Sequence, residues 1–142
     1  MDEVSRYCFL AGALPILFLG VVHVTATPLA LDRPKGLSPR DPGVAEAMTR
    51  TTLLLTRRVD VWHAWIGFNL SHSLGVVLLA VVVLLVGRSP ASFAAQAPVF
   101  VPLAVLVSGA YVAIGARYWF RSPVVGCSLS FVLFLCSLGL RA

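Results

Sequence analysis

The sequence predicts an all-α integral membrane four-helix bundle with one amphipathic interfacial helix in the first loop. The 142-residue chain is 58% apolar and only 12% charged, and its mean hydropathy is +0.90. Every Asp, Glu, Lys and Arg lies between or outside four stretches, which are 7–31, 61–87, 89–116 and 122–140. Each stretch reaches or nearly reaches the ~20 residues that a helix needs to cross the hydrocarbon core. A soluble domain of this length could not cover so much apolar surface.

One transmembrane domain is therefore expected over residues 1–142. Its spans are predicted at about 7–31, 61–86, 97–118 and 122–140, with a cytoplasmic loop at 32–60. The first stretch is interpreted as a retained helix and not as a signal peptide, because Asp2 and Glu3 spoil a basic leader and Pro15 interrupts the apolar run. Residues 117–121 form an aromatic and basic turn between the last two spans.

The basic residues predict the orientation in the membrane. Four spans place three of them on the side of the termini (Arg6, Arg88, Arg141) and eight on the other side (Arg33, Lys35, Arg40, Arg50, Arg57, Arg58, Arg117, Arg121). The positive-inside rule then directs both termini outward and the first loop to the cytoplasm, as in a bacterial inner-membrane protein. The net charge of +5 is thus a topology signal that also attracts anionic membrane lipids. No recognition motif indicates nucleic-acid binding.

The first loop contains a predicted helix. Residues 37–42 have turn chemistry that ends in a candidate N-cap, Asp41, followed by Pro42 at the first helical position. Residues 43–56 then suit a short amphipathic helix at the interface, before the chain turns inward at 57–60. The helix is either a plain connector or a lid over whatever the bundle encloses.

The second stretch carries the most specific local sequence, at residues 62–75. On a helix, Gly67, Ser71 and Gly75 form a row of small residues that lets another helix approach closely. Roughly opposite lie four larger or polar residues, Trp65, Asn69, His72 and Ser73. We expect the first row to pack and the second to present polar groups. Polar side chains inside a membrane need partners, so the second row must face protein, ligand or water.

A polar pocket inside the bundle is the candidate site. At 1.5 Å per residue, His23 in the first span and Asn69 and His72 in the second reach overlapping depths. Its predicted ligand-binding residues are His23, Trp65, Asn69, His72, Ser73 and Tyr111. The alternative is that these residues only bond helices to one another. His63 lies near the interface and needs no special role.

The residue types narrow the chemistry of this pocket. A metal site is not expected, since the spans contain no acidic residue and the chain has only three cysteines. Paired carboxylates for acid–base catalysis are absent from the spans, so an enzyme is not favoured, although it is not excluded. His23 and His72 leave b-haem or a quinone as weak cofactor candidates. The sequence does not decide whether Cys8 and Cys136 pair.

The run Trp-Ile-Gly-Phe-Asn-x-Ser-His-Ser-x-Gly at 65–75 resembles a family of small, uncharacterised bacterial four-helix membrane proteins. The resemblance takes in 37–42, His23 and 117–120, and so covers most of the chain. It implies the same architecture and points to His23, Asn69, Ser71 and His72, without naming a function.

The leading functional hypothesis is a small membrane protein that binds a partner subunit or an apolar or amphipathic ligand through the polar pocket. One alternative is a membrane-embedded enzyme or redox carrier that acts on lipid, quinone or haem. Another is a purely structural accessory subunit of a larger complex. Membrane lipids and a protein partner or second copy are the expected contacts of all three.

Overall fold

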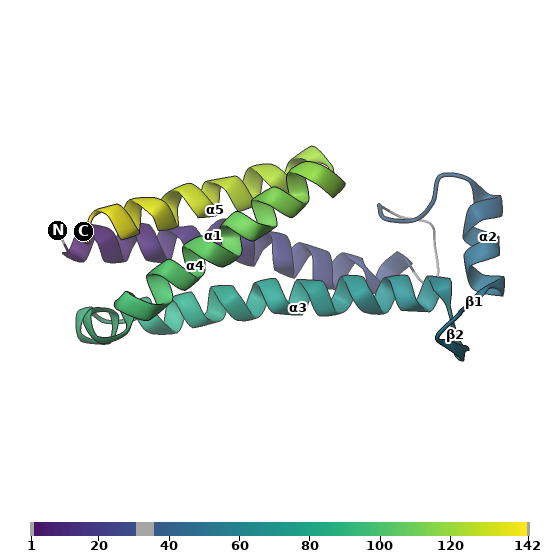
Figure 1. Cartoon of the computed structure of the whole chain (residues 1–142), viewed down its shortest axis with the longest axis horizontal. Helices are drawn as coiled ribbons and strands as arrows, with labels where there is room; N and C mark the ends of the chain where they lie inside the picture. The colour runs from purple at the N-terminus through teal and green to yellow at the C-terminus, as the bar shows by residue number, and fades with distance from the viewer. Residues whose placement is uncertain (1, 31–35, 142) are drawn as a thin grey trace. The chain divides into compact units, whose positions relative to one another are not determined.

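The computed structural model describes residues 2–30 and 36–141, and its long elements are all helices (Figure 1). The helices are α1 (Asp2–Ala26), the 3₁₀ turn η1 (Pro28–Ala30), α2 (Pro42–Arg50), α3 (Val61–Gly87), α4 (Pro90–Tyr118) and α5 (Arg121–Gly139). A short hairpin of β1 (Thr52–Leu53) and β2 (Thr56–Asp60) precedes α3. In the described residues, α1, α3, α4 and α5 are long and apolar enough to cross a membrane. The all-α class and the four apolar helices are therefore confirmed.

The chain divides into two compact units. Unit 1 comprises 1–19 and 76–142, and unit 2 comprises 20–75. Helices α1 and α3 each contribute one end to each unit. The predicted end of the first span at Leu31, and the basic residues Arg33 and Lys35, lie outside the described residues; α1 itself ends at Ala26.

An aromatic cluster forms the centre of unit 1. Phe9 on α1 lies 5.5 Å from Phe93 on α4 and 5.7 Å from Phe134 on α5, measured between ring centroids, and all three rings are buried. Mostly small or β-branched residues extend this core along α1, α3 and α4 (Ala13, Ile16, Val76, Ala80, Val83, Val86, Ala97, Val101, Ala104). The opposite faces expose large apolar side chains such as Leu78 and Leu106. Exposed faces of this kind suit lipid and not water.

Small residues allow the helices of unit 1 to approach closely. Ser5 on α1 donates a hydrogen bond to the Ser137 carbonyl of α5 at 2.8 Å, and both serines are fully buried. A Cβ built on Gly12 would lie 2.5 Å from the ring of Phe134. A Cβ built on Gly126 of α5 would lie equally close to the side chain of Leu19. Bulk at these positions would force the helices apart.

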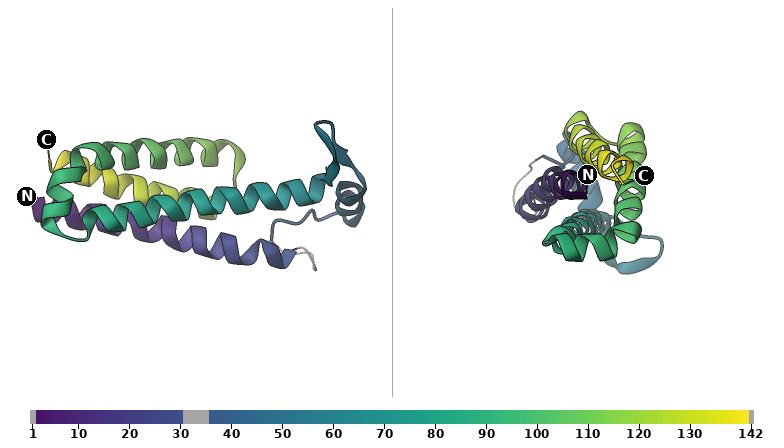
Figure 2. Two further views of the ribbon diagram at one scale, coloured as in Figure 1. Left: turned by 90° about the horizontal axis from the view of Figure 1, so that it is seen from below. Right: turned by 90° about the vertical axis from the view of Figure 1, so that its left-hand side faces the viewer.

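Helix α4 begins earlier than predicted, at Pro90 and not at 97. Ser89 is its N-cap and accepts a hydrogen bond from the Ser92 backbone N–H at 3.2 Å, while Pro90 occupies the first turn. Figure 2 shows α4 changing direction sharply after its first turns. Pro98 and Pro102 lie inside the helix, and proline bends a helix because it removes one backbone hydrogen bond and clashes with the preceding turn.

The loop helix of unit 2 is only partly as predicted. Asp41 caps α2 by accepting a hydrogen bond from the Gly43 N–H at 2.8 Å, Pro42 starts the helix, and Glu46 pairs with Arg50. The prediction that this helix continues to Thr56 is wrong, because α2 ends at Arg50. Figure 1 shows α2 beside the first turn of α3, with its axis running across the direction of α3.

The residues after α2 form an antiparallel hairpin. Thr51 has extended backbone angles, Leu53 pairs with Thr56, and Leu54 and Leu55 at the tip are 111% and 92% exposed. β-Branched Thr51 and Thr52 favour a strand over a helix, and the cross-strand hydrogen bonds satisfy the backbone. The result is a basic hairpin with an apolar tip beside the start of α3.

Gly12→Ala should lower the free energy of unfolding by about 1–3 kcal/mol, because the new methyl group meets the buried ring of Phe134. Gly139→Ala is the matched control, since nothing lies within 4 Å of its Cβ position. In the control, the free energy of unfolding should stay the same or rise by up to ~1 kcal/mol, as it does for Gly→Ala changes inside helices. Thermal unfolding in detergent measures both variants. Equal stability of Gly12→Ala and the parent would contradict the packing.

Candidate functional site

The end of α1 and the first half of α3 bring His23 and Asn69 together within unit 2. His23 Nε2 lies 3.1 Å from Asn69 Oδ1. Asn69 is only 7% exposed, although it lies in the most apolar of the four helices. The overlap in depth that the sequence predicted thus becomes a direct hydrogen bond between two helices.

The remaining bonds of Asn69 define the proton arrangement of this contact. Asn69 Nδ2 donates to the Trp65 carbonyl at 2.8 Å, so the amide oxygen faces His23 and can only accept. His23 Nε2 must therefore be the protonated nitrogen. In the neutral ring, Nδ1 then carries a lone pair. Ser73, 1% exposed, donates to the Asn69 backbone carbonyl at 2.7 Å and completes the buried row.

His72 adds a second imidazole to this cluster. Its ring centroid lies 6.2 Å from that of His23, with the two rings edge to face at 76°. Phe68 stacks on His72 at 6.4 Å with an interplanar angle of 16°, and Phe68 is 66% exposed. His23, Asn69 and His72 are named the imidazole site below. The site combines an amide that is held in place with two half-buried rings whose nitrogens can donate or accept hydrogen bonds.

The other predicted ligand residues have different surroundings. Trp65 supplies its backbone carbonyl to Asn69, and its side chain is half-buried at 37% exposed. Tyr111 belongs to unit 1, where its ring lies 5.9 Å from that of Trp119. Its membership of the ligand site stays a prediction.

The two predicted faces of α3 differ in burial within unit 2. Trp62, Ile66, Asn69 and Ser73 are buried, so the row with the polar residues is the packed one. The glycine row, Gly67, Ser71 and Gly75, is exposed, and a Cβ on Gly67 would meet nothing within 4 Å. The physical reason is that the side chains of Asn69 and Ser73 need hydrogen-bond partners inside the protein, while Gly67 and Gly75 have no polar side chain to satisfy. Whether the glycine row packs on a second chain stays a prediction.

His63 has a structural role at the start of α3. Asp60 accepts hydrogen bonds from the His63 backbone N–H at 2.8 Å and from His63 Nδ1 at 2.7 Å. The backbone bond, reinforced by the side-chain bond, holds the pKa of Asp60 below its ordinary value of 3.8. Asp60 is thus the N-cap of α3, a signal in the sequence that the prediction of a simple inward turn overlooked.

Within residues 2–30 and 36–141, no group of three or more His, Cys, Asp and Glu side chains could hold a metal ion. Cys8, Cys127 and Cys136 are free thiols.

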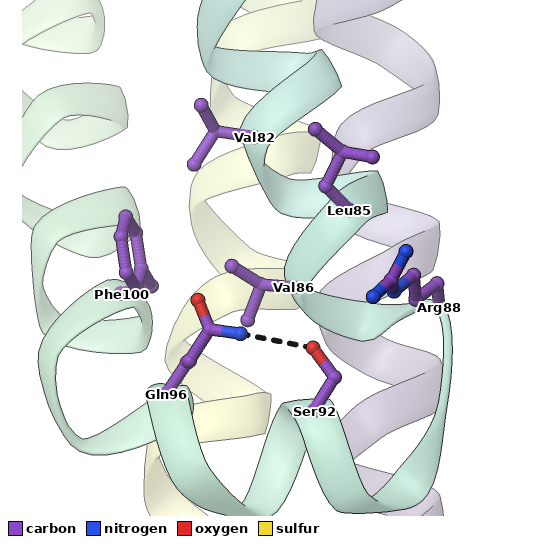
Figure 3. Close-up of a pocket in the computed structure, with 7 residues that line it drawn as sticks. All are labelled: Val82, Leu85, Val86, Arg88, Ser92, Gln96 and Phe100. Atoms are coloured by element: carbon purple, nitrogen blue, oxygen red, sulfur yellow. Dashed lines mark hydrogen bonds between the residues drawn. The ribbon is translucent and has the colours of Figure 1, made fainter.

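Sequence reasoning missed a hollow of about 320 Å³ in unit 1 (Figure 3). Its walls come from the end of α3 and the beginning of α4 (Val82, Leu85, Val86, Arg88, Ser92, Gln96, Phe100). The sequence feature that could have indicated this hollow is Gln96, which is the one amide side chain in the 89–116 stretch and is close in sequence to Arg88.

These features define the class of the protein as an all-α chain with four helices long and apolar enough to cross a membrane. Comparison with protein-family models, curated proteins and solved structures finds no match to this chain. The resemblance of residues 65–75 to a family of small bacterial membrane proteins therefore stays a prediction.

The Asp60 cap should make stability depend on pH. A carboxylate whose pKa is lower in the folded than in the unfolded state stabilises the fold above its unfolded pKa, and this stabilisation is lost as the pH falls through the folded pKa. We therefore expect the melting temperature to exceed that of Asp60→Asn at pH 6 and the difference to shrink below about pH 4. Melting curves from pH 6 to 3 test this. A difference that does not change with pH would contradict it.

The His23–Asn69 bond should appear as a coupling energy. In a double-mutant cycle of His23→Ala and Asn69→Ala, we expect the two effects to be non-additive by about 0.6–1.7 kcal/mol, the range for hydrogen bonds between membrane helices. His23→Ala with Ser71→Ala is the control cycle, because the Ser71 hydroxyl, within the part of the chain that the structure describes, bonds only to the Phe68 carbonyl of its own helix. Unfolding in detergent gives each energy. Additive effects in both cycles would show that the His23–Asn69 bond contributes nothing to the free energy of unfolding.

Proposed function

We propose that this chain is a small integral protein of the bacterial inner membrane that binds an amphipathic ligand through the imidazole site. The membrane location is supported by four long apolar helices and by the large apolar side chains that they expose. The count of basic residues supports termini that face outward and a cytoplasmic first loop.

The imidazole site carries the proposal because of what the His23 ring can bind. In hydrocarbon, each polar group without a partner costs several kcal/mol. Each end of the Asn69 amide makes one bond inside the protein, and His23 in its neutral form has a lone pair on Nδ1. A hydroxyl or amide N–H from a ligand would satisfy it, and His72 places a second imidazole beside it.

The exposed surface around the site favours a ligand with an apolar body. Phe68 stacks on His72 and is two-thirds exposed, and Val22, next to His23 on α1, is 47% exposed. A molecule with one polar end and an apolar tail, such as a lipid or a quinone, fits this combination. The site is only partly covered, so such a ligand would enter sideways from the membrane.

A partner subunit is the second candidate, and the exposed glycine row favours it. Gly67, Ser71 and Gly75 leave a strip of α3 where another helix could approach the backbone. Such a partner would leave the imidazole site untouched. Enzymatic or redox activity would use the same two histidines and would be recognised by turnover or by a visible absorption spectrum.

Native mass spectrometry of the protein released gently from its own membrane tests the proposal. We expect the mass of the chain plus one discrete small molecule. His72→Ala and His23→Ala should lose the adduct, because each removes an imidazole from the site. Ser71→Ala should keep it, since its hydroxyl bonds only within α3.

Three results would count against this proposal. A mass that contains other polypeptides and no small molecule would favour the partner subunit, and Gly67→Leu should then break the complex. An adduct that survives both histidine variants would place the ligand elsewhere. A coloured adduct with a haem mass would convert the proposal to that of a redox carrier.

A further inference from the structure

The hollow of unit 1 lies where α4 changes direction beside the end of α3. Figure 3 shows Ser92 and Gln96 on the stretch of α4 before the bend and Phe100 on the stretch after it. Val82, Leu85 and Val86 of α3 form the facing wall. The hollow is therefore apolar along its length and polar at the end that Arg88, Ser92 and Gln96 line.

Arg88 differs from the other arginines at this end of unit 1. Arg6 pairs with Glu3 at 2.8 Å and donates to the Gly87 carbonyl at 3.0 Å, while Arg141 lies 5.1 Å over the ring of Phe93. Arg88 is exposed and, among the described residues, has no ion pair or hydrogen bond. Its charge thus stays available at the rim of the hollow.

Ser92 and Gln96 hold the polar end of the hollow in a defined shape. Gln96 Nε2 donates to Ser92 Oγ at 2.9 Å, which leaves the Gln96 carbonyl oxygen and its second N–H directed elsewhere. The Gln96 side chain is exposed and lines the hollow, near the loop between α3 and α4 that the predicted spans place at the membrane surface. The polar end therefore offers a cation and amide donors next to an apolar wall.

We propose that this hollow binds one anionic phospholipid, with the headgroup phosphate on Arg88 and an acyl chain along the walls of Val82, Leu85 and Phe100. Charge complementarity selects the occupant, because an unpaired guanidinium binds a phosphate in a forked geometry. A zwitterionic lipid has the same phosphate but carries its own cation beside it, so only an anionic lipid brings net negative charge to Arg88. A volume of about 320 Å³ accommodates a headgroup and part of one chain. This site is independent of the imidazole site, which lies in unit 2.

Competition between two lipids tests the proposal. The purified full-length protein in a neutral detergent receives equal amounts of phosphatidylglycerol and phosphatidylcholine with the same acyl chains, and native mass spectrometry reads the adducts. We expect one phosphatidylglycerol to bind in preference. Arg88→Gln should reduce this preference about fivefold, the typical effect of one basic residue at an anionic surface. Arg88→Lys should keep part of it.

Two further variants separate a built site from general attraction. Arg121→Gln removes an exposed cation at the start of α5 and should leave the preference unchanged. Val82→Phe narrows the hollow without changing charge and should weaken phosphatidylglycerol binding. Inorganic phosphate at the same concentration should not displace the lipid, because it lacks the acyl chain.

The proposal would be overturned if the two lipids bound equally or if Arg121→Gln acted as strongly as Arg88→Gln. It would also be overturned if Val82→Phe had no effect, since the headgroup would then bind without the hollow. Displacement by inorganic phosphate alone would show a site for free phosphate instead of lipid.

Discussion

The requirement that polar groups inside an apolar helix find partners within the protein governs this structure. Asn69 illustrates it, because each end of its amide is bonded, one to His23 on another helix and one to the Trp65 carbonyl of its own. An amide left in hydrocarbon without these bonds would cost several kcal/mol. This one residue therefore fixes which face of α3 turns inward in unit 2 and which side of α1 meets it.

Unit 1 satisfies the same requirement by different means. Ser5 bonds to the Ser137 carbonyl of another helix, and Ser108 bonds to the Ala104 carbonyl of its own helix at 2.6 Å. Ser130 is the exception among the described residues, because its buried hydroxyl has no hydrogen-bond partner. Apolar contact between helices has no hydrophobic driving force in lipid, so close packing of small residues and aromatic rings must supply the attraction. Phe9, Phe93 and Phe134, with Gly12 beside them, provide this packing. The two units thus share a physical rule, although one contains a candidate ligand site and the other a candidate lipid site.

Local signals in the sequence were sufficient wherever the deciding interaction spans a few residues. Asp41 and Pro42 predicted the start of α2. Nearly overlapping depths along two helices indicated that a contact between His23 and Asn69 is possible, and the structure contains it. Local signals failed at the hairpin, where Leu53 pairs with Thr56 and cross-strand bonds outweigh the helical pattern of 51–56. They also failed at the hollow, because its walls come from α3 and α4 and depend on how α4 bends.

By itself, the sequence determined that this protein has four long apolar helices. In hydrocarbon, an apolar stretch of this length satisfies its backbone hydrogen bonds within one segment only when it is a helix. Only the tertiary structure decided which face of each helix is buried. Helices that are apolar all round carry almost no periodic signal, so the choice depends on single residues such as Asn69, Ser73 and Phe134 and on their partners from distant parts of the chain.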